Sequence, residues 1–190
     1  MRMASMRKVA VFGCALVLAV FALSACSSGK DSGGGEGGGN VPEAASDQVV
    51  TFPRAYFPDA PTTEQATAQL EALGCTDVVD NGDGSFTASM SADAYNQLVS
   101  DLYDQVMDAV NTLGDKTTYP NIEEVTYDEG FSTMQVKLNT ETPGIEDTFA
   151  LAVVGVPAST YQQVAGLPVG CEVSLVLQSG TVQQTAVFPQ

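Results

Sequence analysis

The segment from residue 91 to residue 113 constrains the fold most strongly, because its apolar residues keep a helical period for about six turns. Acidic and amide side chains occupy the opposite face, Ser91 can cap the start, and Gly114 ends the pattern. A long helix with one apolar face needs a surface to cover, so we expect it to lie on a sheet. The apolar stripe consists of Tyr95, Leu98, Val99, Leu102, Val106, Met107, Val110 and Leu113.

Strand-like segments surround this helix, mostly in pairs. Residues 48–52 read as a strand ended by Pro53. A hairpin is predicted for 75–80 and 85–90, around the turn sequence Asn81-Gly82-Asp83-Gly84. Further strands are expected at 122–127, 131–138, 171–177 and 182–188. Hairpins interleaved with helices predict an α+β fold, with an antiparallel sheet and helices packed on one of its faces.

Two further helical segments are predicted. Thr62-Thr63-Glu64-Gln65 fits a capping box, and apolar residues follow it at helical spacing. Residues 145–154 also have helical character, and we expect Gly155-Val156-Pro157 to break the helix. Residues 158–165 would then form a second short helix.

Residues 1–26 have the organisation of an export signal. Cationic residues precede an apolar run over residues 9–23, which at about fifteen residues is too short to span a bilayer. Leu23-Ser24-Ala25-Cys26 resembles the lipobox of bacterial lipoprotein signal peptides. The resemblance implies removal of residues 1–25 and acylation of Cys26, for example by palmitate, and two acyl chains suffice for stable anchoring. A secretory signal with a coincidental cysteine is the alternative.

The rest of the chain divides into a linker and one domain. Residues 26–47 are rich in Gly and Ser and predict a flexible, disordered tether, and residues 48–190 have the length of a single extracytoplasmic domain. Without residues 1–25 the chain keeps four Lys and Arg against 23 Asp and Glu, a formal net charge of −19. Such a domain repels nucleic acid and anionic headgroups, so nucleic acid is not expected as a partner. The charge serves solubility, or it attracts a cationic partner or divalent ions.

The order of several short motifs resembles a group of lipoproteins from Gram-positive bacteria. Those proteins share a similar signal, tether and single domain, and the resemblance implies no activity and no site residue. The motifs are Val49-Val50-Thr51-Phe52-Pro53, Gly74-Cys75-Thr76-Asp77-Val78-Val79 with Asn81-Gly82-Asp83-Gly84-Ser85, Ile122-Glu123-Glu124-Val125-Thr126-Tyr127-Asp128, and Val187-Phe188-Pro189.

Cys75 and Cys171 form an even pair in an exported domain, and we expect a disulfide between them, with two buried free thiols as the alternative. Gly74-Cys75 and Gly170-Cys171 each follow a helix and open a strand, which suggests two copies of a helix–hairpin unit with the cysteines at equivalent positions. Chance similarity remains the competing interpretation of so short a match.

The residue inventory argues against an enzyme. The chain has no histidine, which removes the usual triads and the usual base near neutral pH. No phosphate-binding loop or zinc-binding motif occurs, so no cofactor is expected. Paired carboxylates remain as an improbable hydrolase site: Asp101, Asp104, Asp108, Glu123, Glu124, Asp128 and Glu129.

Two other groups of residues suggest ligands. Asp77, Asp80, Asn81 and Asp83 have oxygen ligands that suit calcium, but turn geometry alone explains them, and no metal site is predicted. The second group is aromatic and can equally well cover the core or anchor a partner: Tyr56 and Phe57 beside Arg54, and Tyr119 and Tyr161.

The combined expectation is a lipoprotein anchored at the extracytoplasmic face of the cell membrane. Its domain would be a non-enzymatic binding module for an unidentified envelope protein or ligand. If the final strand lies at a sheet edge, it can accept an added peptide strand. A structural envelope protein without a specific ligand is the second interpretation.

Overall fold

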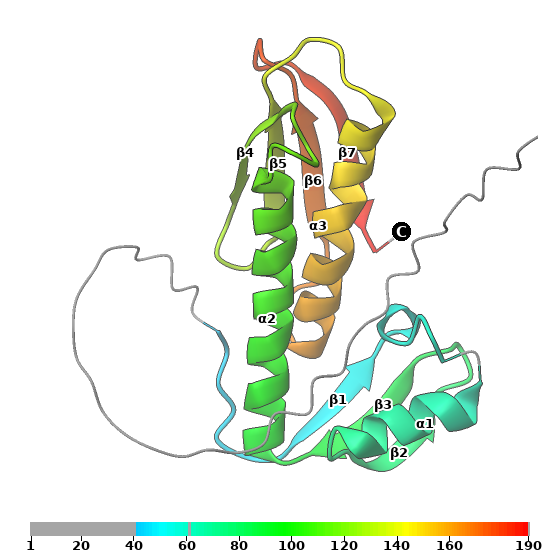
Figure 1. Cartoon of the computed structure of the whole chain (residues 1–190). Coiled ribbons are helices and arrows are strands. Elements are labelled where there is room, and N and C mark those ends of the chain that lie inside the picture. Colours follow the sequence, from blue (N-terminus) through cyan, green and yellow to red (C-terminus); the bar gives the residue numbers. More distant parts are fainter. Residues whose placement is uncertain (1–40, 61, 190) are drawn as a thin grey trace, which may run out of the picture. The chain divides into compact units, whose positions relative to one another are not determined.

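The structure is a computed structural model that describes residues 41–60 and 62–189. The predicted signal peptide, the predicted lipidation site at Cys26 and the predicted linker up to residue 40 lie outside the described residues. No helix within the described ranges has the length and apolar character needed to cross a membrane. The elements, labelled in Figure 1, are β1 (Gln48–Phe52), the 3-10 turn η1 (Arg54–Tyr56), α1 (Thr63–Ala72), β2 (Thr76–Asp80), β3 (Phe86–Met90), α2 (Ala92–Gly114), β4 (Ile122–Tyr127), β5 (Thr133–Leu138), α3 (Ile145–Val164), β6 (Cys171–Val176) and β7 (Val182–Phe188).

The strands form two sheets. The smaller has the order β1-β3-β2 with antiparallel pairs, and the larger has the order β4-β5-β6-β7. In the larger sheet β5 and β6 are parallel, whereas the outer pairs are antiparallel. The α+β class is therefore confirmed, but the single antiparallel sheet was wrong. The parallel pair arises because α3 carries the chain back along the sheet between β5 and β6, as parallel neighbours require.

Each helix is followed by a hairpin, so the fold contains three helix–hairpin units. These are α1 with β2–β3, α2 with β4–β5, and α3 with β6–β7. The two segments of the suggested repeat belong to the first and third units. Equivalent positions in those units lie in different sheets, which matters for the cysteines below.

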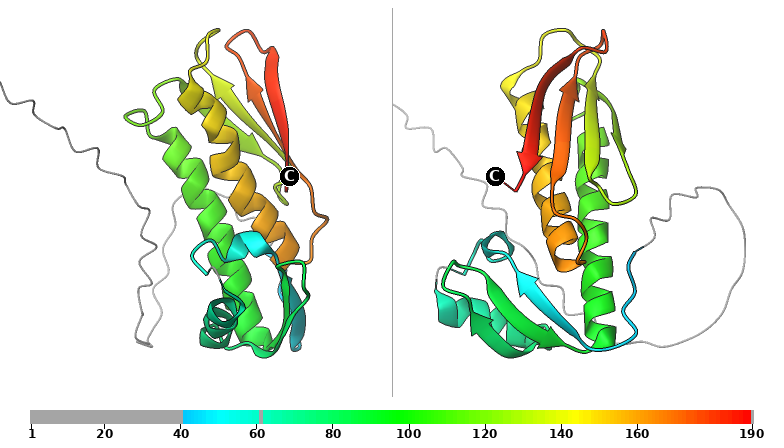
Figure 2. Two further views of the ribbon diagram at one scale, coloured as in Figure 1. Left: turned by 90° about the vertical axis from the view of Figure 1, so that its right-hand side faces the viewer. Right: turned by 180° about the vertical axis from the view of Figure 1, so that it is seen from behind.

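The larger sheet carries its helices on one face, as predicted. α2 contacts β4 and α3 contacts β6 and β7, while the two helices contact each other (Figure 2). The stripe predicted for α2 is buried at Tyr95, Leu98, Val99, Leu102, Val106 and Leu113. α1 packs on β2, and the capping box at Thr62 is present, with Gln65 as its partner. One apolar cluster includes residues from both sheets and all three helices.

α3 is one continuous helix through Pro157, and the predicted break is wrong. Gly155 is required for packing: a Cβ there would lie 2.2 Å from Cδ2 of Phe188 on β7. Pro157 removes one backbone donor, but Val154, Ala158 and Tyr161 are buried on either side of it. Tertiary packing therefore holds the helix together where the local sequence favours a break.

The segment before β1, assigned to the linker from sequence, is fixed to α2. The backbone N–H of Ala44 donates to Oδ1 of Asn96 at 2.7 Å, and Nδ2 of Asn96 donates to the carbonyl of Ala44 at 3.0 Å. Val41 and Ala44 also pack against the core. Contacts of the folded domain thus begin before residue 48.

Candidate functional site

Cys75 and Cys171 are both free, buried thiols in the structure, so the predicted disulfide is not formed. Cys75 immediately precedes β2 of the smaller sheet, and Cys171 opens β6 of the larger one. The two cysteines hold equivalent positions in their helix–hairpin units, but the two units belong to different sheets. Burial raises the pKa of each thiol to about 11, and Asp128 contributes to the rise at Cys171. Both thiols are protonated at neutral pH and are poor nucleophiles.

The acidic residues of the β2–β3 hairpin stabilise its turn. Oδ1 of Asp80 accepts from the N–H of Gly82 at 2.8 Å, and Oδ1 of Asp83 accepts from the N–H and hydroxyl of Ser85 at 2.9 and 2.6 Å. The bonds from Ser85 lower the pKa of Asp83. Within the described residues, no three His, Cys, Asp or Glu side chains are grouped closely enough to hold a metal ion. Asp80 and Asp83 each use one carboxylate oxygen in the turn, and Asp77 and Asn81 do not complete a cation site with them.

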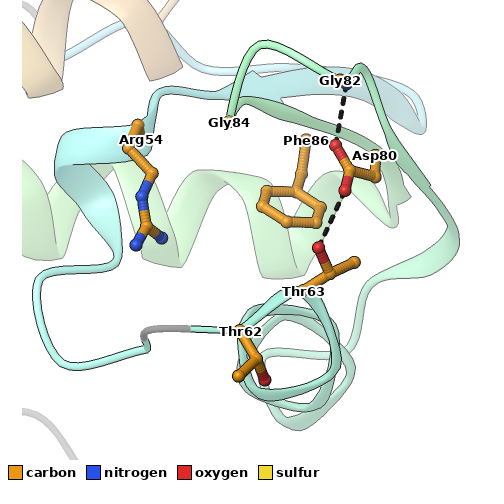
Figure 3. Close-up of a pocket in the computed structure, with 7 residues that line it drawn as sticks. All are labelled: Arg54, Thr62, Thr63, Asp80, Gly82, Gly84 and Phe86. Atoms are coloured by element: carbon orange, nitrogen blue, oxygen red, sulfur yellow. Dashed lines mark hydrogen bonds between the residues drawn. The ribbon is translucent and has the colours of Figure 1, made fainter.

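A shallow pocket of about 290 Å³ lies beside this turn (Figure 3). Its lining residues are Arg54, Thr62, Thr63, Asp80, Gly82, Gly84 and Phe86. Two of its polar groups already have partners: Nη1 of Arg54 donates to the carbonyl of Ala60 at 2.9 Å, and the Thr63 hydroxyl donates to Oδ2 of Asp80 at 2.9 Å. Figure 3 shows the Phe86 ring between Arg54 and Asp80. The charged groups therefore stabilise the loop and do not converge on a common point.

The aromatic residues suggested as an anchor belong to the core. Phe57 is buried among Phe52, Tyr56 and Phe86, with ring centroids 5.2 to 6.4 Å from its own. Burial raises the pKa of Tyr56 to about 12. Tyr161 is also buried, and Tyr119 is partly buried against the core. The interpretation of these residues as core cover is confirmed.

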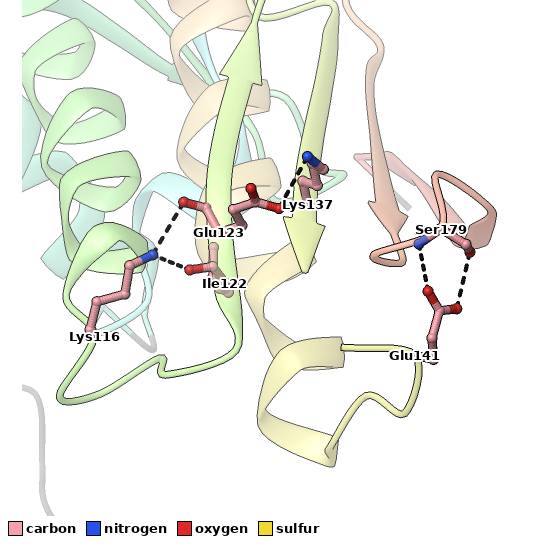
Figure 4. A network of polar contacts seen from close by, with 6 residues as sticks. All are labelled: Lys116, Ile122, Glu123, Lys137, Glu141 and Ser179. Atoms are coloured by element: carbon pink, nitrogen blue, oxygen red, sulfur yellow. Dashed lines mark hydrogen bonds and ion pairs between the residues drawn. The ribbon is translucent and has the colours of Figure 1, made fainter. Parts of the chain in front are cut away.

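The carboxylates suggested for a hydrolase are dispersed. Asp101, Asp104 and Asp108 are exposed along α2, and Glu123 forms a 3.0 Å ion pair with Lys137 (Figure 4). Asp128 accepts hydrogen bonds from Ser132 and Thr133 in the β4–β5 turn. Partial burial would raise the pKa of Asp128, but these bonds outweigh it, and the pKa is lowered. Glu124 and Glu129 are exposed near this hairpin.

Two other polar contacts hold one end of the larger sheet (Figure 4). Nζ of Lys116 donates to the carbonyls of Ile122 and Glu123 at the start of β4. The carboxylate of Glu141 accepts from the N–H and hydroxyl of Ser179, which joins the β5–α3 loop to the β6–β7 turn. Lys116, Lys137 and Glu141 thus all have structural partners.

The outer face of α3 differs from these polar regions, because it is apolar. Ile145 is 73% exposed, Phe149 63% and Val156 44%, and Ala152 is also exposed. Their spacing of four, three and four residues places them on one side of the helix. We call these four residues the α3 stripe. An exposed apolar row of this kind marks an interaction surface more often than a scattered exposed leucine or valine does.

The α3 stripe belongs to a part of the chain that is almost without charge. From Thr148 to the C-terminus, Glu172 is the only Asp, Glu, Lys or Arg, although the chain has 23 carboxylates. β7, in the same region, has an uncharged sequence and exposed side chains at Val182 and Val187. The carboxylates of the described chain are therefore concentrated before residue 148.

Comparison of the chain with protein-family models, with curated proteins and with solved structures finds no match to any of them. Function is therefore inferred from the residues themselves.

The sequence-based interpretation missed the α3 stripe. α3 has apolar residues almost all round, so periodicity could not distinguish the exposed row from the buried ones. The near absence of charge after Thr148, where Glu172 is the only charged residue, is the sequence signal of this unusual surface.

Proposed function

We propose that this chain is a lipoprotein anchored through Cys26 at the extracytoplasmic face of the membrane, and that its domain is a non-enzymatic binding module of the cell envelope. The residues 23–26 support the anchor. The single observation that supports binding is the exposed α3 stripe on a strongly acidic domain. The partner class that suits this surface is an envelope protein presenting the apolar face of a helix, since rows at helical spacing pack against one another.

The chemistry around the described ionisable groups favours binding over catalysis. Asp83 and Asp128 accept hydrogen bonds within their own turns, while Asp80 also accepts from Thr63 of α1 and Glu141 accepts from Ser179 of the β6–β7 turn. Both buried thiols have raised pKa values. Enzymes instead keep an activated base or nucleophile directed into a cleft.

Anchoring is tested by Cys26→Ser in the full chain. We expect the wild-type chain to sediment with membranes and incorporate labelled palmitate, and the variant to lose the label and enter the soluble fraction. Unchanged label incorporation in the variant would contradict the lipoprotein assignment.

Binding is tested by a photo-cross-linking amino acid placed at Phe149 in growing cells, with the same substitution at Asp104 on α2 as the matched control. We expect a discrete adduct from position 149 and none from position 104. The adduct should disappear when Ile145 and Val156 are both changed to Ser, because these substitutions remove the apolar row and leave exposed positions exposed. Equal adducts from both positions would argue against a specific surface, and adducts to lipid alone would indicate a membrane contact.

A further inference from the structure

The two edges of the larger sheet are treated differently by the sequence. β4 carries Glu123 and Glu124, and Lys116 donates to two of its carbonyls. Charged residues, lysine above all, are the usual means of preventing a strand edge from pairing with another chain. β4 is therefore a protected edge.

β7, at the opposite edge, carries none of these charges, and its pairing with β6 is irregular only between Leu175 and Val176. It pairs with β6 alone, and no other hydrogen bond joins its backbone to the described residues. Its seven residues, VQQTAVF, include no charge and no proline, and it is the longest strand of either sheet. A long uncharged edge strand is the configuration that accepts another strand.

The edges of the smaller sheet do not share these properties. β2 carries Asp77 and Asp80, whereas β7 carries no charged residue. β1 is shorter than β7 and contacts α3. β7 is therefore the strand edge most open to pairing.

We propose that β7 pairs antiparallel with β7 of a second copy of this chain, which joins the two larger sheets into one. Strand edges are self-complementary in this arrangement, because each copy supplies the same alternating donors and acceptors about a two-fold axis. Near the middle of β7, Thr185 would face a neutral hydroxyl-bearing or amide-bearing side chain of the other copy, and such cross-strand pairs are favourable.

The distribution of charge favours a second copy of this chain as the partner of β7. Two strongly acidic domains repel each other wherever their carboxylates meet, and this repulsion is least across the region that follows Thr148, where Glu172 is the only charged side chain. Glu172 on β6 pairs with Val187 of β7, so a full strand separates it from the free edge. Identical copies can therefore approach through β7 without bringing carboxylates into direct opposition.

The pairing would involve more than backbone. α3 contacts both β6 and β7, and neighbouring strands lie about 4.8 Å apart. Across the two-fold axis the two α3 helices would then lie about 10–14 Å apart, a little beyond the 8–10 Å of packed helices. Side chains from the helix-facing side of β7, Gln184 and Ala186, which pair with the buried Leu175 and Val173, are available to fill the gap. The α3 stripe is not needed for this contact, so dimer formation and partner binding are separate properties.

The experiment compares the full chain with Val187→Lys, which adds a charge at a 53% exposed position opposite Glu172, so the fold is preserved. Thr126→Lys on the exposed face of β4 is the matched control. In analytical ultracentrifugation of the detergent-purified chain we expect wild type and the control to dimerise, and Val187→Lys to raise the dimer dissociation constant at least tenfold. A wild-type chain that is monomeric at all concentrations, or a dimer unaffected by Val187→Lys, would overturn the proposal.

Cross-linking gives a second readout. Cysteine substituted in turn at each residue from 183 to 187 should give a disulfide-linked dimer whose yield peaks at one position and falls on either side, because antiparallel pairing brings only one position opposite itself. Thr126→Cys should give no more than the background of the native cysteines. Cross-links from β7 to a different envelope protein in cells, without the self-linked dimer, would overturn self-pairing. The adduct at Phe149 is unaffected by either result, so the two proposals can fail separately.

Discussion

The two helices on the larger sheet expose chemically different sides to solvent. α2 exposes Asp101, Asp104 and Asp108, whereas α3 exposes the α3 stripe. Both helices bury their other sides against the same core, so packing does not require the difference. A solvated acidic row is what a surface helix ordinarily has. The apolar row on α3 is the exception, and it is the reason for assigning interaction to the C-terminal part of the domain.

The largest predicted effect is on the free energy of unfolding, and it comes from changing a glycine to alanine in each of the two helices. Gly155→Ala on α3 should destabilise the domain by about 3 kcal/mol, because the new methyl group would overlap the Phe188 ring. Gly114→Ala on α2 is the matched control. No atom lies within 4 Å of its added Cβ, and helix propensity should make it neutral or stabilising by up to about 1 kcal/mol. Urea unfolding measures both.

A double substitution tests the cause. With Phe188→Ala present, Gly155→Ala should cost much less than it does alone, because the ring that it overlaps is gone. Additive costs would show that Phe188 does not press on Gly155, and the continuous packing of α3 on β7 would have to be reconsidered.

The second prediction compares how the two helices begin. At the start of α3, Oδ2 of the fully buried Asp147 accepts from the N–H of Gly144 at 2.7 Å and from Nδ2 of Asn121 at 3.0 Å. Asp147→Ala leaves both donors without this acceptor and should cost about 2–3 kcal/mol. Ser91→Ala at the exposed cap of α2 should cost about 1 kcal/mol. Thermal or urea unfolding of both variants gives the difference.

Asp147→Asn is the informative control, because both donors bond the same oxygen, Oδ2, and an amide oxygen can accept both bonds. It should retain most of the stability that Asp147→Ala loses. Equal costs for Asp147→Ala and Ser91→Ala would mean that the buried contacts of Asp147 contribute no more than an ordinary cap.

The elements that could be predicted from sequence are those specified by neighbouring residues. Ser91 and the stripe after it define α2, the capping box at Thr62 defines the start of α1, and Asn81-Gly82-Asp83-Gly84 defines a hairpin. Division into two sheets and the parallel pairing of β5 with β6 depend on contacts between distant segments. No local pattern contains that information.

At Gly155 and at the cysteine pair, a local pattern predicts a feature that contacts with distant residues override. Gly155 looked like a helix breaker, but its role is set by Phe188, more than thirty residues away. An even pair of cysteines in an exported domain predicts a disulfide, yet Cys75 and Cys171 stand at the starts of strands in different sheets and are free thiols. Exposure of the α3 stripe is likewise a tertiary property, because it depends on which side of an apolar helix the sheet covers.

The smallest predicted effect tests whether the acidic row on α2 does more than solvate it. Asp104 and Asp108 are one turn apart, and like charges at that spacing repel. Asp104→Asn should therefore stabilise the domain by about 0.3 kcal/mol at low salt, and the gain should disappear near 1 M salt, where the Debye length is about 3 Å. Gln105→Ala, at an exposed uncharged neighbour, should show no such salt dependence. Urea unfolding at both salt concentrations measures the gain. A loss of stability in Asp104→Asn would reveal a favourable contact of this carboxylate, and the acidic face of α2 would then need a structural explanation of its own.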